Sequence, residues 1–192
     1  MGFKRNGKAH KIFSIYLLLI LITEVSVDMF AAFGINNHFF ATYILFIALI
    51  LLSCFFYFLF DSIGSVKKEV IKYCSSLVAV ALLIQYSLKP SMYFTFNSVG
   101  LLVVYCLIVV YAVLYLFELI SKQLPFRYAT IGIVIYHFSS ILIFVGGSYI
   151  AKLPRDLSLI IWSINAALFI AYQLLILWEW KQTFYQKITR QG

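Results

Sequence analysis

Long apolar stretches alternate with short polar ones along the whole chain. Six stretches approach the ~20 residues that a helix needs to cross a bilayer. They cover residues 12–33, 39–60, 71–88, 99–120, 128–150 and 158–180. A strand of a membrane barrel would alternate polar and apolar side chains, whereas these runs are continuously apolar. The pattern predicts an all-α, polytopic transmembrane helical bundle of six spans, forming a single domain over residues 1–192.

The connections between the predicted spans are short and leave no room for a soluble domain. Pro90, Pro125 and Pro154 all fall in them, where the missing proline N–H does no harm. The first stretch has the basic start of a secretion signal. However, its apolar core continues through Glu24 to Phe33 without a small-residue cleavage site, so we interpret it as a retained span.

Composition supports the membrane assignment. The chain is 64% hydrophobic and 11% charged, whereas soluble domains carry about 25% charged residues. A net charge of +8 would suggest nucleic acid in a soluble protein, but here the basic residues lie in loops and tails, so we expect no nucleic-acid partner. The cysteines, Cys54, Cys74 and Cys106, lack the spacing of a disulfide framework or a zinc site.

The distribution of basic residues predicts the orientation. With six spans, 12 of the 15 Lys and Arg residues lie on one side, together with both termini. The positive-inside rule places that side in the cytoplasm. Five or seven spans would mix the two sets, so the asymmetry also favours six.

Two acids in the first span are the leading candidates for chemistry. Glu24 and Asp28 are four residues apart and share one helix face, and Thr23 precedes them. A charge near the bilayer centre costs about 2.5–3.5 kcal/mol on insertion scales, and two like charges disfavour each other further. The pair indicates either a proton or cation site, or a structural clamp between helices.

Polar residues recur in the last two spans. His137 and Ser140 lie in the fifth, where small residues at seven-residue spacing favour close helix packing. Asn165, Tyr172 and Glu179 share one face of the sixth. We hypothesise that spans 1, 5 and 6 face each other around a polar interior, and that the interior acts as a proton relay or as a packing seam. Its members are Thr23, Glu24, Asp28, His137, Ser140, Asn165 and Tyr172.

The polar and aromatic residues at the ends of the spans are typical of the membrane interface. At the cytoplasmic ends we expect interfacial ion pairs of acids with nearby lysines. The acids are Asp61, Glu118 and Glu179, and the lysines are Lys67, Lys122 and Lys181. At the outer ends, residues 36–38 and 93–97 predict turns with an aromatic belt, or alternatively a small ligand mouth.

Common sequence motifs of catalytic and cofactor-binding sites do not occur in this chain. HExxH, GxSxG, P-loop and CxxC patterns do not occur. We therefore predict no catalytic residue, no metal ligand and no cofactor.

Four segments resemble a group of small multi-helix membrane proteins of Bacteroidetes-type bacteria. The segments are YLLLILITEVSVDMF, NNHFFATYILF, IGIVIYHFSSILIFVGGSYI and LIIWSINAALFIAYQLLILWEWK. Members of that group often have one more span at the N-terminus. The resemblance implies a multi-pass protein of a bacterial inner membrane. It also implies that Thr23, Glu24, His137 and Asn165 occupy the group's characteristic polar positions, and it implies no particular activity.

Three function classes follow from the sequence. The favoured one is a non-catalytic membrane module, a sensor or a subunit that docks a membrane protein partner or forms a homo-oligomer. The second is a channel or an ion-coupled transporter that uses the buried acids and His137. The third is an intramembrane enzyme acting on lipid.

Overall fold

The computed structural model describes residues 7–95, 97–146, 150 and 152–189, with side chains up to residue 182. Within these residues the regular structure is entirely helical. In chain order the elements are α2 (Gly7–Ala32), α3 (Phe39–Ile47), the π-helix η1 (Ala48–Leu52), α4 (Ser53–Ser62), α5 (Lys67–Leu88), the 3₁₀-helix η2 (Pro90–Phe94), α6 (Ser98–Ser121), α7 (Arg127–Val145) and α9 (Arg155–Thr189).

The described part of the chain contains six helical stretches that are long and apolar enough to cross a membrane. They are Gly7–Ala32, Phe39–Ser62, Lys67–Leu88, Ser98–Ser121, Arg127–Val145 and Arg155–Gln182. The predicted all-α polytopic bundle is confirmed, with ends displaced by a few residues. The predicted fifth span extended to residue 150, whereas α7 ends at Val145, and residues 147–149 lie outside the described residues.

The chain divides into two compact units, residues 1–111 and 112–192, and the boundary falls within α6. The single domain over residues 1–192 stays a prediction. In both units, the helix faces that do not pack against a neighbouring helix carry exposed apolar side chains. Surfaces that face lipid require such side chains.

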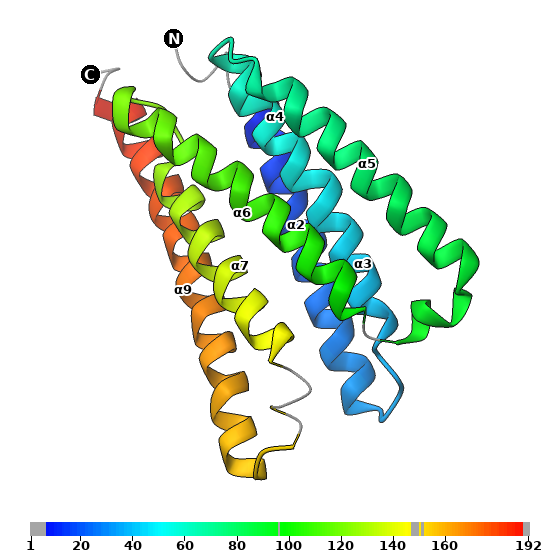
Figure 1. The fold of residues 1–192 in the computed structure, drawn as a ribbon. Coiled ribbons are helices and arrows are strands. Elements are labelled where there is room, and N and C mark those ends of the chain that lie inside the picture. The colour runs from blue at the N-terminus through cyan, green and yellow to red at the C-terminus, as the bar shows by residue number, and fades with distance from the viewer. Residues whose placement is uncertain (1–6, 96, 147–149, 151, 190–192) are drawn as a thin grey trace. The chain divides into compact units, whose positions relative to one another are not determined.

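In the first unit, α2 packs against α3, η1 and α4, and α4 packs against α5 (Figure 1). The α2 side chains that face this core recur every three or four residues: Ala9, Phe13, Tyr16, Ile20 and Thr23. Phe13 stacks on Phe55 of α4 with ring centroids 4.7 Å apart. Since lipid is as apolar as these side chains, close van der Waals packing holds such helices together.

Two glycines end helices in the first unit. Gly34 and Gly64 adopt φ values of 67° and 68°, in the left-handed region that a side chain disfavours. After α2, the Gly34 N–H donates to the Ala31 carbonyl and the Ile35 N–H to the Phe30 carbonyl. This is the Schellman arrangement, which satisfies carbonyls that the helix leaves unpaired and turns the chain back toward α3.

In the second unit, α7 and α9 run side by side (Figure 1). The face of α9 turned to α7 includes Asn165, Tyr172 and Ile176, whereas Ile170, Leu174 and Leu177 are exposed. The α9 helix therefore places Asn165 and Tyr172 toward α7 and exposes aliphatic side chains together with Trp162, Trp178 and Trp180 on its remaining surface.

Candidate functional site

The polar residues of the last two spans form a seam between α7 and α9. Ser140 is fully buried, and its Oγ donates a hydrogen bond to Asn165 Oδ1 at 3.2 Å. A hydroxyl and an amide that pair across two membrane helices contribute about 0.6 kcal/mol on average. The structure thus brings together Ser140 and Asn165, two of the residues of the hypothesised polar interior.

His137 lies one turn before Ser140 and is 1% exposed. Its Nδ1 lies 2.9 Å from the Ile133 carbonyl of the same helix. Because a carbonyl only accepts, this bond requires the proton on Nδ1 and leaves Nε2 as the acceptor nitrogen. The imidazole also meets the Tyr172 ring edge-on, with centroids 6.2 Å apart.

Tyr172 is the aromatic centre of the seam. Its ring stacks on Tyr136 at 5.4 Å with an interplanar angle of 3°. A Cβ at Gly132 would lie only 2.7 Å from Tyr172 Cδ2. The lack of a side chain at Gly132 therefore permits the α7 backbone to approach the Tyr172 ring.

Glu179 closes the seam at the start of α7. Its Oε1 accepts a hydrogen bond from the Phe126 backbone N–H at 2.9 Å, and its Oε2 accepts one from the Tyr128 N–H at 2.7 Å. Phe126, the N-cap residue, has a φ of 65° and offers no side-chain cap of its own. A carboxylate at a helix N-terminus satisfies orphan N–H groups and complements the helix dipole.

Sequence analysis assigned Glu179 to the row with Asn165 and Tyr172 but expected only an interfacial ion pair from it. The seven-residue spacing was the available signal, because the same spacing points all three side chains at α7. The ion-pair prediction is confirmed for Glu118 with Lys122, whereas Asp61 pairs with Lys68 and not with the predicted Lys67. Lys68 Nζ donates to Asp61 at 2.7 Å, and Lys122 Nζ to Glu118 at 2.9 Å.

The acids of the first span lie beside the packed face of α2. Thr23 is buried, and its Oγ donates to the Leu19 carbonyl at 2.7 Å. Glu24 is partly buried and Asp28 is exposed. At 100° per residue the two carboxylates point about 60° and about 100° away from the centre of the packed face. Among the described residues of the first unit, none forms a hydrogen bond or ion pair with either carboxylate.

The hypothesised polar interior is distributed over both units. Thr23, Glu24 and Asp28 belong to the first unit, and the His137, Ser140, Asn165 and Tyr172 group belongs to the second. The structure assembles the second group into one seam. The juxtaposition of the first-span acids with that seam stays a prediction.

A second polar cluster, which sequence analysis did not identify, surrounds the start of α6. Asn97 is 5% exposed, and its amide donates to Gln85 Oε1 and to the Tyr86 hydroxyl, each at 3.2 Å. Its Oδ1 accepts from the Gly100 N–H at 2.9 Å. Asn97 therefore caps α6 and ties the helix to the end of α5.

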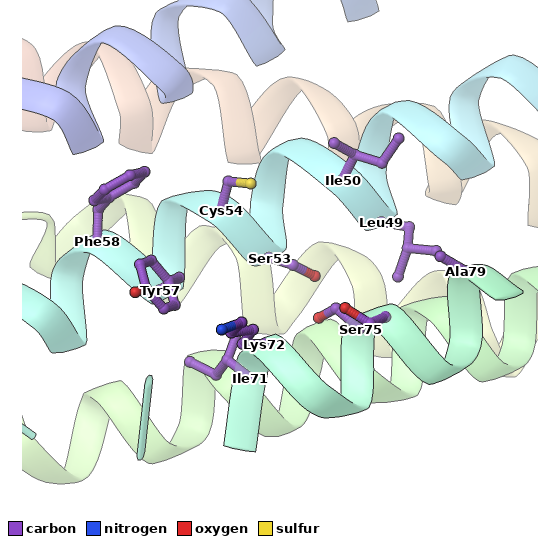
Figure 2. Close-up of a pocket in the computed structure, with 11 residues that line it drawn as sticks. Leu49, Ile50, Ser53, Cys54, Tyr57, Phe58, Ile71, Lys72, Ser75 and Ala79 are labelled. Atoms are coloured by element: carbon purple, nitrogen blue, oxygen red, sulfur yellow. The ribbon is translucent and has the colours of Figure 1, made fainter. Parts of the chain in front are cut away.

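A pocket of about 390 Å³ lies between the η1–α4 segment and α5 (Figure 2). Its lining falls into three levels along the two antiparallel helices. Tyr57, Phe58, Ile71 and Lys72 form the level nearest the connecting turn; Ser53, Cys54, Ser75 and Ser76 form the middle; and Leu49, Ile50 and Ala79 form the deep end. The pocket passes from charged through hydroxylic to aliphatic.

Ser53 is the notable residue of the middle level. Its Oγ is buried and, within the described structure, has no hydrogen-bond partner. The hydroxyls of Thr23, Ser26 and Thr130 each donate to a carbonyl four residues earlier in their own helix. Ser53 directly follows the π-helix η1, a kind of insertion often found at functional sites. A buried hydroxyl without a partner costs about 1–3 kcal/mol.

Comparison with family models, with curated proteins and with solved structures finds nothing that matches this chain. The class is therefore defined by the chain's own features. Its apolar helices make it an all-α, multi-pass membrane protein that resides in a lipid bilayer.

Proposed function

We propose that this protein is a non-catalytic membrane subunit that docks another membrane protein through the α2 face carrying Glu24 and Asp28. The observation that carries the proposal is the state of these carboxylates. They lie in a membrane-spanning helix, beside its packed face, with no hydrogen-bonding or ionic partner among the described residues of their own unit.

The chemistry of the acids defines the partner. Two carboxylates within a span require a donor at the same depth, because unpaired charge in hydrocarbon is costly. The occupant is a transmembrane helix of a different protein that carries Lys, Arg, His or Asn near the bilayer centre. A second copy of this chain is disfavoured, since a two-fold interface through this face would bring four carboxylates together.

The α7–α9 seam supports the non-catalytic part of the proposal. His137 Nδ1 bonds a backbone carbonyl, Ser140 bonds Asn165, and Glu179 bonds two backbone N–H groups. The Ser140 and Glu179 bonds link α7 to α9, the His137 bond lies within α7, and each polar group named here already has a structural partner.

The proposed orientation rests on charge. With six spans, twelve of the 15 Lys and Arg residues fall on the side of both termini, which supports cytoplasmic termini. The inner membrane of a bacterium belongs to the proposal through the resemblance alone.

Site-specific photocrosslinking in the native membrane tests the docking face. A photoreactive residue replaces Leu21, which helix geometry places about 20° beyond Asp28. A matched control replaces Ile22, the next residue, which points about 100° further round the helix. We expect the Leu21 probe, and not the Ile22 probe, to crosslink a second membrane protein. Glu24→Gln combined with Asp28→Asn abolishes that crosslink.

Two outcomes would overturn the proposal. Crosslinks from position 21 to residues 127–182 of the same chain would show that the acids serve an internal polar core. A crosslink to another protein that survives the double substitution would show that the carboxylates do not recognise it. Support also requires that the captured protein carry a basic or amide side chain within a span, and that moving this side chain by one residue weaken the crosslink.

A further inference from the structure

We propose that the pocket between α4 and α5 binds one anionic phospholipid. The headgroup phosphate lies at Lys72, the glycerol ester region lies at Ser53 and Ser75, and an acyl chain extends along Leu49 and Ala79. The site does not depend on the docking function proposed above, because α2 contributes no residue to the lining.

The order of the lining residues matches the order of groups in a lipid. Steps of four residues along the η1–α4 segment, and of three and four residues along α5, bring Tyr57 level with Lys72, Ser53 with Ser75, and Leu49 with Ala79 (Figure 2). The first and last levels are seven residues apart on α5 and eight on the η1–α4 segment, or about 10–12 Å along the helices. A phospholipid shows the same sequence of charge, ester oxygens and hydrocarbon when its headgroup lies at the membrane surface.

Ser53 gives the strongest indication of a ligand. Figure 2 shows its hydroxyl turned from α4 toward α5, and its Oγ has no partner in the described structure although Ser53 is 5% exposed. The Oγ is covered in the described structure, so a lipid ester carbonyl at this level would accept its proton once the Ser53 side chain changes rotamer. Ser75 opposite is already bound, because its Oγ lies 3.0 Å from the Tyr111 hydroxyl.

The charges at the open end favour an anion. Lys72 lines the pocket, and its ammonium lies 5.7 Å from the Tyr73 ring centroid. The nearby Asp61 is paired with Lys68 at 2.7 Å, and Glu69 is the other acid in this part of α5. Basic residues near the cytoplasmic surface attract anionic lipid headgroups, each by about fivefold in affinity.

The pocket volume suits the acyl chain of a single lipid. At about 390 Å³ the pocket is in the range of ligand sites, roughly 300–1,000 Å³. An apolar peptide would leave Lys72 and the serine level unmatched, and free phosphate would leave the aliphatic level empty. A phospholipid satisfies all three levels.

Photolabelling of the full chain in lipid nanodiscs tests the proposal. The probe is phosphatidylglycerol with a diazirine on its acyl chain, and the zwitterionic reference is phosphatidylcholine with the same chain. We expect phosphatidylglycerol to label peptides covering residues 49–58 and 71–79. Labelling by phosphatidylcholine at these peptides should be about fivefold weaker.

Each level has a variant with a matched control. Ala79→Phe fills the deep end and should abolish labelling, whereas Ala81→Phe on an exposed face of α5 should not. Ser53→Ala should weaken labelling about threefold to tenfold, the value of one hydrogen bond, whereas Ser26→Ala in α2 should not. Lys72→Gln should remove the preference for phosphatidylglycerol, whereas Lys89→Gln at the other end of α5 should retain it.

Three results would overturn the proposal. The first is labelling of these peptides that Ala79→Phe and Ala81→Phe change equally. The second is an equal yield with both lipids in the unsubstituted protein. The third is loss of labelling on addition of millimolar inorganic phosphate, which would assign the pocket to the free anion. If Ala79→Phe fails to yield a monodisperse protein, Ala79→Leu replaces it, and the Ser53 and Lys72 variants test the other levels.

Discussion

The Glu179 carboxylate of α9 accepts a hydrogen bond from the Tyr128 backbone N–H at 2.7 Å, across 51 residues of sequence. The same carboxylate accepts from the Phe126 N–H, so one side chain of the last helix caps the first turn of α7. The cap stabilises a residue with an uncommon backbone, because Phe126 has a φ of 65° and is buried. Replacing a helix cap costs about 0.5–2 kcal/mol in other proteins.

Glu179→Ala should therefore lower the free energy of unfolding by about 1–3 kcal/mol, because it leaves two N–H groups without their acceptor. Glu179→Gln should cost less, since one amide oxygen can still accept. Unfolding in mixed micelles by titration with a denaturing detergent measures both values.

Glu118→Gln is the matched control for Glu179, because it removes an acid whose visible partner is Lys122, one residue beyond the end of the same helix. Such pairs contribute about 0–1 kcal/mol. Equal losses for Glu179→Ala and Glu118→Gln would show that the cap carries no special weight.

The close approach of the Tyr172 ring to Gly132 gives a second prediction. A Cβ at Gly132 would lie 2.7 Å from Tyr172 Cδ2, closer than carbon atoms approach without a shift. Gly132→Ala should therefore separate α7 and α9 and destabilise the protein by about 1–3 kcal/mol, the usual cost of overpacking. Gly7→Ala is the control, because nothing lies within 4 Å of a Cβ there.

A cysteine crosslink between α7 and α9 would report the separation in Gly132→Ala directly. If Gly132→Ala is as stable as Gly7→Ala, then Tyr172 can rotate away and the close approach is not required. Adding Tyr172→Leu to Gly132→Ala should recover part of the loss if the ring is the obstacle.

The Ser140–Asn165 hydrogen bond is suited to a double-mutant cycle. The single variants Ser140→Ala and Asn165→Ala each break the 3.2 Å bond, and the double variant removes both groups. We expect a coupling energy of about 0.5–1.5 kcal/mol, in the range of hydrogen bonds between membrane helices. The cycle uses the same unfolding titration, and a coupling near zero would show that solvent or lipid replaces the bond.

Hydrophobic patterning was sufficient to predict the six spans, because a run of about 20 apolar residues has few alternatives to a membrane helix. The row of Asn165, Tyr172 and Glu179 was also readable, since seven-residue spacing keeps side chains on one face. The role of Glu179 as hydrogen-bond acceptor for the first turn of α7 could not be predicted from the sequence. It depends on the backbone of Phe126, which only the packing of α7 against α9 determines.

The pocket between α4 and α5 could not be predicted from the sequence either. Sequence analysis did not single out Ser53, because it lies in an apolar run and the composition of the π-helix before it does not mark it. Ser75 and Ser76 lie in the predicted span over residues 71–88, and their alignment with Ser53 follows only from the antiparallel register of the two helices. Polar residues that are distant in sequence form a site only when the register of two packed helices brings them to the same level. A single sequence does not specify that register.

Two substitutions at Asn97 distinguish the contribution of its helix cap from that of its hydrogen bonds to α5. Asn97→Ala removes the acceptor for the Gly100 N–H and both amide donors, so we expect a loss of about 1–3 kcal/mol. Asn97→Asp keeps the acceptor at the helix N-terminus, where a carboxylate is favourable. Because Gln85 and Tyr86 can turn donors toward that carboxylate, Asn97→Asp should cost about 1 kcal/mol or less.

Asn36→Ala is the control for the Asn97 variants, because Asn36 Oδ1 accepts from the His38 N–H in an exposed turn. Its loss should stay within about 0.5 kcal/mol, as is usual for surface substitutions. The detergent titration, read together with helicity from circular dichroism, measures all three variants. If Asn97→Asp proved as damaging as Asn97→Ala, the amide bonds to Gln85 and Tyr86 would be the important ones. The stability of the α5–α6 connection would then depend on those bonds, and not on the cap.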